Sequence, residues 1–368
     1  MDKFAFIMHP LELDDIFRKL KFMRSWPRPM VERIFRSLPP FKISDITGIE
    51  GPVNAGEGFF VGLPLTAPQI LELPQDYVLK KIIRCGKLAE RKGAKIVGLG
   101  ALTSVVGDAG ITIAKNLDIA VTTGNSYTVG TALQGTREAA RLMGHDLSRA
   151  QVLVVGATGS IGSVCARILA RDVRFLTLLA RNTVRLEHLA GRIMSETGLS
   201  AAITRDVKKA VRQADIIVAV SGSAENLIKP EDLKPGAVVC DVARPRDVSK
   251  AVADQRPDVL VIEGGVVEVP GDVNFNFNFG FPPKTSYACM AETMILTLEG
   301  RFESYSLGRD LSVAQIDEIC RLAEKHGFRL AGMRSFERAV SPEHIKAVRA
   351  KAEEARASGG KRLVSVGK

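Results

Sequence analysis

The sequence predicts an α/β protein that combines a doubly wound, mainly parallel sheet with a second α/β domain completed by C-terminal helices. Its 368 residues are long for one domain, so two are expected. Six short apolar segments alternate with helical stretches or loops between residues 151 and 264, which is typical of a parallel sheet. A glycine-rich turn directly follows the first of them. We expect the doubly wound domain over 148–275, and the second domain over 1–125 together with 280–340.

The individual elements follow from local patterns. In the first part of the chain, the apolar runs predict strands at 4–8, 94–100 and 117–124, and periodic runs predict helices at 76–93 and 126–143, each ending near a glycine. The six strands of the doubly wound sheet are expected at 151–156, 174–180, 200–205, 215–221, 236–243 and 258–264. A long loop rich in Gly, Pro, Asn and Phe follows over 266–286, and two helices are expected near 286–300 and 312–326.

The amino-acid composition argues against a disordered, fibrous or membrane-spanning protein. The chain is 46% hydrophobic and 25% charged, which excludes a disordered or fibrous chain. No stretch approaches the ~18 uncharged apolar residues of a membrane helix, and the first residues lack the pattern of a signal peptide. The five cysteines show no pairs at metal-ligand spacing, so we expect neither disulfides nor a metal site. These observations predict a cytoplasmic protein.

The net charge of +10 is concentrated in two segments. Residues 18–36 carry seven basic side chains and one acidic one, and residues 341–368 carry seven and three. Such local patches favour docking of an acidic partner over binding of nucleic acid. The 18–36 segment also contains Phe22 and Trp26, and Phe17 directly precedes it. Three interpretations therefore stay open: a solvated helix face, a dock for an acidic carrier protein, or peripheral contact with an anionic membrane. Residues 341–368 are expected to form a basic, mobile tail.

The glycine-rich turn predicts a dinucleotide site of the Rossmann type. Gly156, Gly159 and Gly162 stand between a buried strand and a helix, which is the context that this motif requires. The N–H groups at the start of the helix then hold the pyrophosphate. The spacing is G-x-x-G-x-x-G rather than the commoner G-x-G-x-x-G. The expected cofactor contacts are Gly156, Thr158, Gly159, Ser160, Ile161, Gly162, Arg181, Asn182, Ser221 and Gly265.

The end of the second strand of this domain favours NADPH over NADH. An NAD enzyme usually has an acidic residue there, which binds the ribose 2′-hydroxyl. This strand instead ends in Ala180, Arg181 and Asn182. A guanidinium attracts a 2′-phosphate, whereas a carboxylate would repel it.

Cys289 differs from the other four cysteines, which occupy apolar positions of their elements. If Ser286 is the N-cap, Cys289 lies in the first turn of the helix that follows the long loop, roughly opposite its apolar stripe. A thiol near unpaired N–H groups is expected to have a lowered pKa and to be a better nucleophile. The alternative is a helix buried on both sides, because Leu296 shares the face of Cys289. Both interpretations stay open on geometry alone.

Two turns rich in small and hydroxyl residues follow strands of the first domain. They are 98–104 (GLGALTS) and 122–126 (TTGNS). Ligand sites of α/β proteins form at the carboxyl ends of strands, so both turns are candidates for a substrate cleft. Helix capping explains the same residues equally well.

Taken together, these motifs resemble the long-chain acyl-[acyl-carrier-protein] reductases of the cyanobacterial alkane pathway. The resemblance covers roughly residues 90–330. It rests on GLGALTS (98–104), TTGNS (122–126), VVGATGSIGS (154–163), LLARN (178–182), GGVVE (264–268), YACMAE (287–292) and EKHGF (324–328).

The resemblance implies a fold related to shikimate dehydrogenase and glutamyl-tRNA reductase, and reduction of a fatty acyl thioester to a fatty aldehyde with NADPH. It implies that Cys289 is the nucleophile, with an acyl-cysteine intermediate, and that acyl carrier protein or acyl-CoA delivers the acyl group. Ser104 or Thr123 is expected to help stabilise the oxyanion. The expected substrate contacts are Leu102, Thr103, Asn125 and Tyr287.

Two other functions compete with this one. An amino-acid or hydroxy-acid dehydrogenase of the shikimate dehydrogenase type would need a Lys–Asp pair, but residues 100–110 contain no lysine and the turn at Asn125 lacks the acid. A non-enzymatic NADP-binding regulator is the third interpretation. The loop after 266 departs from the cyanobacterial form, and its phenylalanines are expected either to line an apolar channel or to pack between domains.

Overall fold

The structure is a computed structural model that describes residues 1–19, 21–221, 227–243, 246–264, 266–278, 280–336 and 338–358, without the side chains of residues 18 and 19. The chain forms two compact units. Unit 1 contains Met1–Tyr127, Val267–Asp310 and Asp317–Arg329, and unit 2 contains Thr128–Val266, Leu311–Ile316 and Leu330–Lys368. Residues 267–275 therefore group with unit 1, not with the doubly wound domain as expected.

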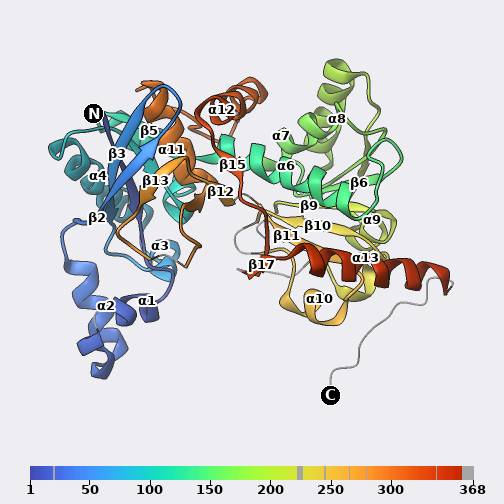
Figure 1. Ribbon diagram of the computed structural model, residues 1–368, viewed down its shortest axis with the longest axis horizontal. Coiled ribbons are helices and arrows are strands. Elements are labelled where there is room, and N and C mark those ends of the chain that lie inside the picture. The colour runs from blue at the N-terminus through green and yellow to red at the C-terminus, as the bar shows by residue number, and fades with distance from the viewer. Residues whose placement is uncertain are drawn as a thin grey trace. The chain divides into compact units, whose positions relative to one another are not determined.

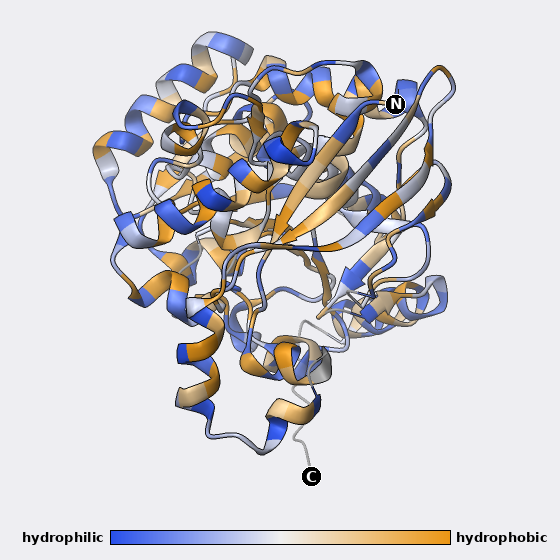
Figure 2. Ribbon diagram, turned by 90° about the vertical axis from the view of Figure 1, so that its left-hand side faces the viewer, coloured by the Kyte–Doolittle hydropathy of each residue, from blue (hydrophilic) through white to orange (hydrophobic). Residues whose placement is uncertain are grey.

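A six-stranded sheet forms the centre of unit 1 (Figure 1). Its order is β13 (Gly271–Asn274), β2 (Phe41–Glu50), β3 (Ala55–Gly62), β1 (Lys3–Met8), β4 (Ala94–Leu99), β5 (Ala120–Thr122). Strands β3, β1, β4 and β5 are parallel, so their carboxyl ends meet at one edge of the sheet. Figure 2 shows apolar residues along these strands, because helices cover both faces.

The helices of unit 1 divide between the two faces. Helix α4 (Gln75–Arg91) and α5 (Ile111–Lys115) pack on one apolar cluster, and α11 (Ala288–Glu299) and α12 (Val313–His326) pack on the other. The shorter elements are α1 (Leu13–Lys19), η1 (Lys21–Ser25), α2 (Arg28–Ser37), α3 (Ala67–Glu72) and η2 (Ala101–Ser104). A small sheet joins β14 (Thr285–Tyr287), β12 (Val266–Glu268) and β15 (Arg329–Leu330).

Unit 2 has the Rossmann topology that the sequence predicted. All six expected strands are present, in the order β11 (Leu260–Glu263), β10 (Val238–Asp241), β9 (Ile216–Ala219), β6 (Gln151–Val155), β7 (Phe175–Leu179), β8 (Ala202–Thr204). This is the strand order of a dinucleotide-binding sheet, with the switch point between β6 and β9. Two antiparallel strands, β16 (Met333–Ser335) and β17 (Arg338–Val340), extend the edge beside β11.

Helices cover both faces of this sheet (Figure 1). They are α6 (Asn125–Leu142), α7 (Ser160–Leu169), α8 (Thr183–Thr197), α9 (Val207–Gln213), η3 (Pro230–Asp232), α10 (Lys250–Gln255) and α13 (Pro342–Ala357). Helix α13 corrects the expectation of a mobile tail, because Ile345, Val348 and Ala352 are buried against the sheet with α6. Residues 359–368 lie outside the described residues.

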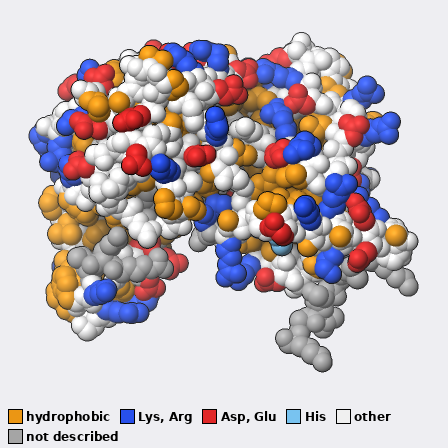
Figure 3. Space-filling view, viewed as in Figure 1, with side chains coloured by type: hydrophobic (Ala, Val, Ile, Leu, Met, Phe, Trp, Pro, Cys, Tyr) orange, Lys and Arg blue, Asp and Glu red, His pale blue; other side chains and the backbone are white. Residues whose placement is uncertain are grey.

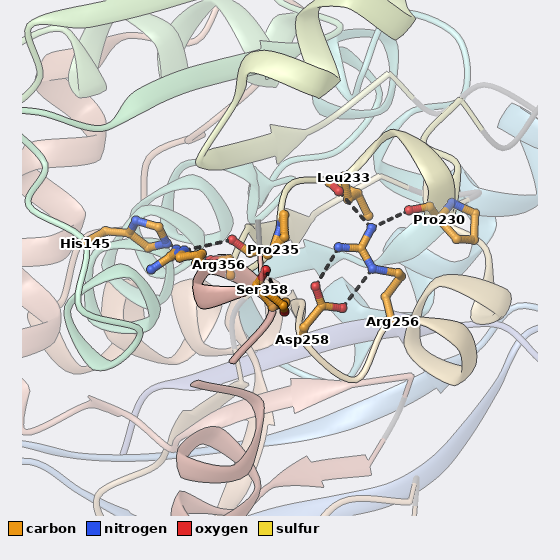
Figure 4. Close-up of polar contacts among 10 residues, drawn as sticks. His145, Pro230, Leu233, Pro235, Arg256, Asp258, Arg356 and Ser358 are labelled. Carbon is orange, nitrogen blue, oxygen red and sulfur yellow. Dashed lines mark hydrogen bonds and ion pairs between the residues drawn. The ribbon is translucent and has the colours of Figure 1, made fainter. Parts of the chain in front are cut away.

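A buried ion pair ties the loops of unit 2 together (Figure 4). Arg256 and Asp258 are both fully buried, and the guanidinium binds the carboxylate through two hydrogen bonds of 2.8 and 2.7 Å. Its third nitrogen donates to the carbonyl oxygens of Pro230 and Leu233 at 2.5 and 2.8 Å. The charge is thus both paired and hydrogen-bonded, which is what burial of a guanidinium requires. None of the described helices is long and apolar enough to cross a membrane.

Candidate active site

Cys289 lies in the first turn of α11, at the carboxyl edge of the unit 1 sheet. The N-cap is Tyr287 rather than the expected Ser286, so Cys289 is the second residue of the helix. Residues 290–298 of α11 are all buried, which matches the alternative of a helix enclosed on both sides. Cys289 itself is only half-buried, because it lies at the end of the helix where the chain enters from the loop.

The turns after β4 and β5 both reach Cys289. Gly124, after β5, has a φ of +75°, and a Cβ atom there would lie 2.3 Å from the Cα and the Cβ of Cys289. Only glycine permits this approach. The backbone of Ala101, after β4, acts on Cys289 to lower the pKa of the thiol, and Ala101 has a φ of +50°, which is strained for a non-glycine residue. Both turns that the sequence singled out therefore meet at the thiol.

The pKa of the thiol is opposite to the sequence prediction. Burial is the main cause that raises the pKa of Cys289 to about 12, and the nearby carboxylate of Glu292 raises it further. The backbone N–H groups of Met290, Cys289 and Ala101 act in the other direction but do not outweigh burial. The expected lowering of the pKa by a helix N-terminus is thus wrong for this chain, and the sulfur is a protonated thiol at neutral pH.

Glu292 occupies the same face of α11, one turn beyond Cys289, and is fully buried. Burial raises the pKa of its carboxyl group, whereas four donors partly compensate. Thr122 Oγ1 donates to Oε1, Ser306 Oγ lies 2.7 Å from Oε1, and the backbone N–H of Tyr127 donates to Oε2 at 2.7 Å. The N–H of Gly124 is the fourth donor. Glu292 therefore holds the turn after β5 against the helix that carries the thiol.

The hydroxyl groups proposed for the oxyanion have backbone partners. Ser104 Oγ donates to the carbonyl oxygen of Ala101 at 2.7 Å, and Thr123 Oγ1 donates to that of Ser306 at 2.6 Å. Thr103 Oγ1 donates to the carbonyl oxygen of Gly100 at 2.8 Å and accepts from the N–H of the same residue at 3.0 Å. The three side chains are buried and shape the turns. Their role toward a substrate stays a prediction.

The other predicted substrate contacts differ in exposure. Leu102 is half-buried and packs on the apolar cluster of α4, and Asn125 is half-buried at the start of α6. Tyr287 is 44% exposed, and its ring lies 4.4 Å from that of Phe281 in a T-shaped contact. Phe275 and Phe277 pack on Phe60, at centroid distances of 6.2 and 6.1 Å. Phe279 lies outside the described residues.

The glycine-rich loop of unit 2 has the expected strand–turn–helix context. It runs from β6 into α7, whose N-cap is Gly159. Gly156 has a φ of +81°, and a Cβ atom there would lie 2.6 Å from the Cα of Ser221. A Cβ atom at Gly162 would lie 2.2 Å from the carbonyl oxygen of Gly156. These close contacts require glycine at both positions, whether or not a ligand is bound.

Ser160 indicates that an anion fits this loop. Its Oγ is buried at the first residue of α7 and has no hydrogen-bond partner in the structure. Gly159 beside it is exposed, and Thr158 and Ile161 are half-buried. A pyrophosphate at the helix start would accept from Ser160 and from the unpaired N–H groups of the first turn. The residues present therefore fit a dinucleotide.

The remaining predicted cofactor residues differ in exposure and in their hydrogen-bond partners. Arg181 is exposed after β7, where it is accessible to a 2′-phosphate. Asn182 is the N-cap of α8, and its Oδ1 accepts from the N–H of Arg185 at 3.0 Å, so capping accounts for it. Ser221 donates its N–H to the buried Asp247 at 2.7 Å. Gly265 lies outside the described residues.

The sequence reasoning missed Glu292 and Ser306. Glu292 stands within the YACMAE motif, but an acid among apolar helix residues was not assigned a role. Ser306 lies in an irregular segment after α11, has a φ of +55°, and is 1% exposed. The spacing of three residues between Cys289 and Glu292 was the available signal, because it places both on one helix face. In the described part of the chain, no group of three His, Cys, Asp or Glu side chains is arranged to hold a metal ion.

Comparison with known proteins finds one family model and two sequence relatives that are similar to parts of this chain. A family model described as shikimate / quinate 5-dehydrogenase matches residues 137–263, which span the six parallel strands of unit 2. The long-chain acyl-[acyl-carrier-protein] reductase of Synechococcus elongatus is 28% identical over 79% of this chain and 88% of its own length. The aminotransferase PigE of Serratia is 30% identical over 93% of this chain, which spans only 41% of that protein.

Two solved structures were compared as well. The malic enzyme of Entamoeba histolytica has a TM-score of 0.44 and 13% identity, covering 99% of this chain and 71% of that one. The quinate dehydrogenase of Corynebacterium glutamicum, in complex with NAD, has a TM-score of 0.33 and 14% identity, covering 70% and 87%. The sequence relatives and the topology of unit 2 support an NAD(P)-dependent oxidoreductase.

Proposed function

We propose that the chain reduces a fatty acyl thioester to a fatty aldehyde with NADPH, through an acyl-cysteine on Cys289. The observation that carries the proposal is the close approach of the turn after β5 to Cys289 at the first turn of α11, where the backbone groups of Cys289, Met290 and Ala101 favour negative charge on the sulfur. Such a cluster of fixed donors beside a nucleophile suits the developing oxyanion of acyl transfer. The similarity to an acyl-[acyl-carrier-protein] reductase agrees with this chemistry.

Acyl transfer to Cys289 balances without an external base. The sulfur forms a bond to the thioester carbonyl carbon, the bond from that carbon to the carrier sulfur breaks, and the thiol proton ends on the departing carrier thiolate. The high pKa of Cys289 means that attack and proton loss are coupled, because almost no thiolate exists beforehand. Acyl carrier protein or acyl-CoA is the proposed carrier.

The same donors serve the reductive step. Bound NADPH would supply the hydride, with the phosphates on the Gly156–Gly162 loop and the 2′-phosphate near Arg181. The N–H groups of Ala101 and Met290 hold the oxygen of the acyl carbon while it carries negative charge. Collapse of the resulting thiohemiacetal on Cys289 then returns the thiol and releases the aldehyde.

The surroundings of Cys289 suit an apolar acyl chain. Cys289 and Phe277 both pack at the margin of the apolar cluster that contains Phe60, Phe275 and Met290. A chain of methylene groups bound there loses its contact with water, at about 0.8 kcal/mol per group.

Substitution of Cys289 tests the proposal. Cys289→Ser is expected to abolish NADPH oxidation with palmitoyl-CoA, while NADPH binding measured by nucleotide fluorescence is kept. Mass spectrometry of the wild type, incubated with palmitoyl-CoA alone, is expected to find a palmitoyl group on Cys289. Cys320→Ser is the matched control, because Cys320 is the other half-buried cysteine. Full turnover by the Cys289 variant, or acylation elsewhere only, would refute the covalent step.

A hydroxy-acid dehydrogenase is the second candidate, because the family model matches residues 137–263. That match covers the cofactor part and none of the turns that meet at Cys289. Oxidation of quinate or shikimate with NADP⁺ by the Cys289→Ser variant would favour this candidate over the thioester reductase.

A further inference from the structure

The N-terminal helical segment, residues 13–19 and 21–37, forms a small core of its own. Leu13, Ile16 and Phe17 from α1 pack against Val31 and Phe35 from α2, separately from the two clusters of the unit 1 sheet. The end of α2 is fastened to α4, because Nζ of Lys81 donates to the carbonyl oxygens of Arg36 and Leu38 at 2.6 and 3.0 Å. Figure 1 shows α1 and α2 beyond the edge of the unit 1 sheet. The segment is therefore a distinct projection with a defined attachment.

Large apolar side chains remain on the outside of this segment. Phe22 is 62% exposed and Met30 is 50% exposed, whereas Trp26 is half-buried with its ring 6.1 Å from that of Phe22. The buried face of α2 already packs in the small core, so these exposed side chains do not contribute to the packing that stabilises the fold. Figure 3 shows hydrophobic side chains gathered on this projection, with Lys and Arg side chains beside them.

The charged side chains around the apolar ones are mostly basic. Lys21, Arg24 and Arg33 are exposed, and Arg33 follows Met30 by three residues, so the two share a face of α2. Arg28 is exposed as well and contacts Asp14 at 3.3 Å, a surface pair of little strength. Exposed aromatic and aliphatic side chains flanked by cations are the features of an interfacial membrane anchor.

We propose that the N-terminal helical segment docks unit 1 on an anionic lipid surface, with Phe22 and Met30 inserted between head groups and the basic side chains on lipid phosphates. A membrane provides an apolar layer below a negative surface, so it matches both kinds of side chain. An acidic protein would match both only if it carried an apolar surface of its own opposite Phe22 and Met30, inside its acidic groups. The proposal rests on this surface alone and does not depend on the reaction at Cys289.

Vesicle binding of the full-length chain tests the proposal. The protein is floated with vesicles of phosphatidylcholine alone or mixed with phosphatidylglycerol. Binding is expected with the anionic mixture only, and it should weaken as salt is added. Arg24→Glu with Arg33→Glu is expected to lower the partition coefficient by at least about 25-fold, since each basic side chain near an anionic surface contributes about fivefold. Phe22→Ser with Met30→Ser should also reduce binding, including at high salt.

Val53→Ser is the matched control, because Val53 is 69% exposed in the turn between β2 and β3, away from the segment. It should bind vesicles as the wild type does, and circular dichroism of every variant should stay unchanged. Absence of wild-type binding to anionic vesicles would overturn the proposal. Equal loss in the Val53 variant, or no loss in either double variant, would also overturn it. Binding to an isolated acyl carrier protein without vesicle binding would assign the surface to a protein partner instead.

Discussion

The protonated state of Cys289 predicts how fast its thiol reacts with an alkylating agent. With a pKa of about 12, only about one molecule in 10⁴ carries a thiolate at pH 8, whereas a free cysteine of pKa ~8.5 is about one-quarter ionised. Alkylation by iodoacetamide should therefore be roughly 10³-fold slower at Cys289 than at the cysteine of a short unstructured peptide. The rate should rise about tenfold per pH unit from pH 7 to pH 10, without a plateau.

Substitution of Glu292, the carboxylate beside the thiol, is expected to change the pKa of Cys289. Because Glu292 raises the pKa of Cys289, Glu292→Gln should lower that pKa and speed alkylation at any fixed pH at which Glu292 is ionised. The buried carboxyl accepts from two backbone N–H groups, and an amide cannot accept at both oxygen positions, so the variant should also lose about 1–3 kcal/mol of unfolding free energy.

Peptide mass spectrometry of the carbamidomethylated cysteine, sampled over time and pH, measures the effect, with Cys320 in the same digest as the internal reference. Denaturant unfolding of the Gln variant measures the stability change separately. A plateau below pH 9 for Cys289 in the wild type would refute the argument that burial dominates over the helix N-terminus. Slower alkylation in the Glu292 variant would refute the electrostatic coupling.

Three further expectations follow from single contacts. Gly124→Ala should abolish aldehyde formation and destabilise unit 1 by several kcal/mol, because the added Cβ would overlap the backbone of α11 at Cys289. Gly198→Ala is the control, because Gly198 has the same φ of +75° with no atom near its Cβ position. It should lower the free energy of unfolding in urea by only about 1 kcal/mol. Ser160→Ala should weaken NADPH binding several-fold in isothermal titration, whereas Ser163→Ala, one turn later, should leave it unchanged. Arg256→Ala should lower the unfolding free energy by about 3–5 kcal/mol, since it leaves a buried carboxylate unpaired; a loss below 1 kcal/mol would contradict this.

Local pattern was sufficient for the six parallel strands of unit 2, but not for β16, β17 and α13. The six strands are short apolar runs bounded by turn residues, and the glycine turn follows the first of them, so composition and spacing alone predict the sheet. The strand pair β2 and β3 was not foreseen. Strand β3 contains three glycines, which argue against a strand locally. The structure explains Gly58, where a Cβ atom would lie 2.6 Å from the ring of Phe4 on the neighbouring strand.

The sequence by itself determined the dinucleotide fold and the two turns at the strand ends, because each depends on neighbours along the chain, whereas Cys289 was assigned as the candidate nucleophile through the family resemblance. Only the tertiary structure decided the ionisation of Cys289. The helix N-terminus is a local feature that favours a thiolate, but burial and Glu292 act through space and prevail. The hydrogen bonds of Glu292 could not be predicted from local pattern either, because Thr122 and Tyr127 lie 170 and 165 residues from it in the chain and Ser306 lies in an irregular segment.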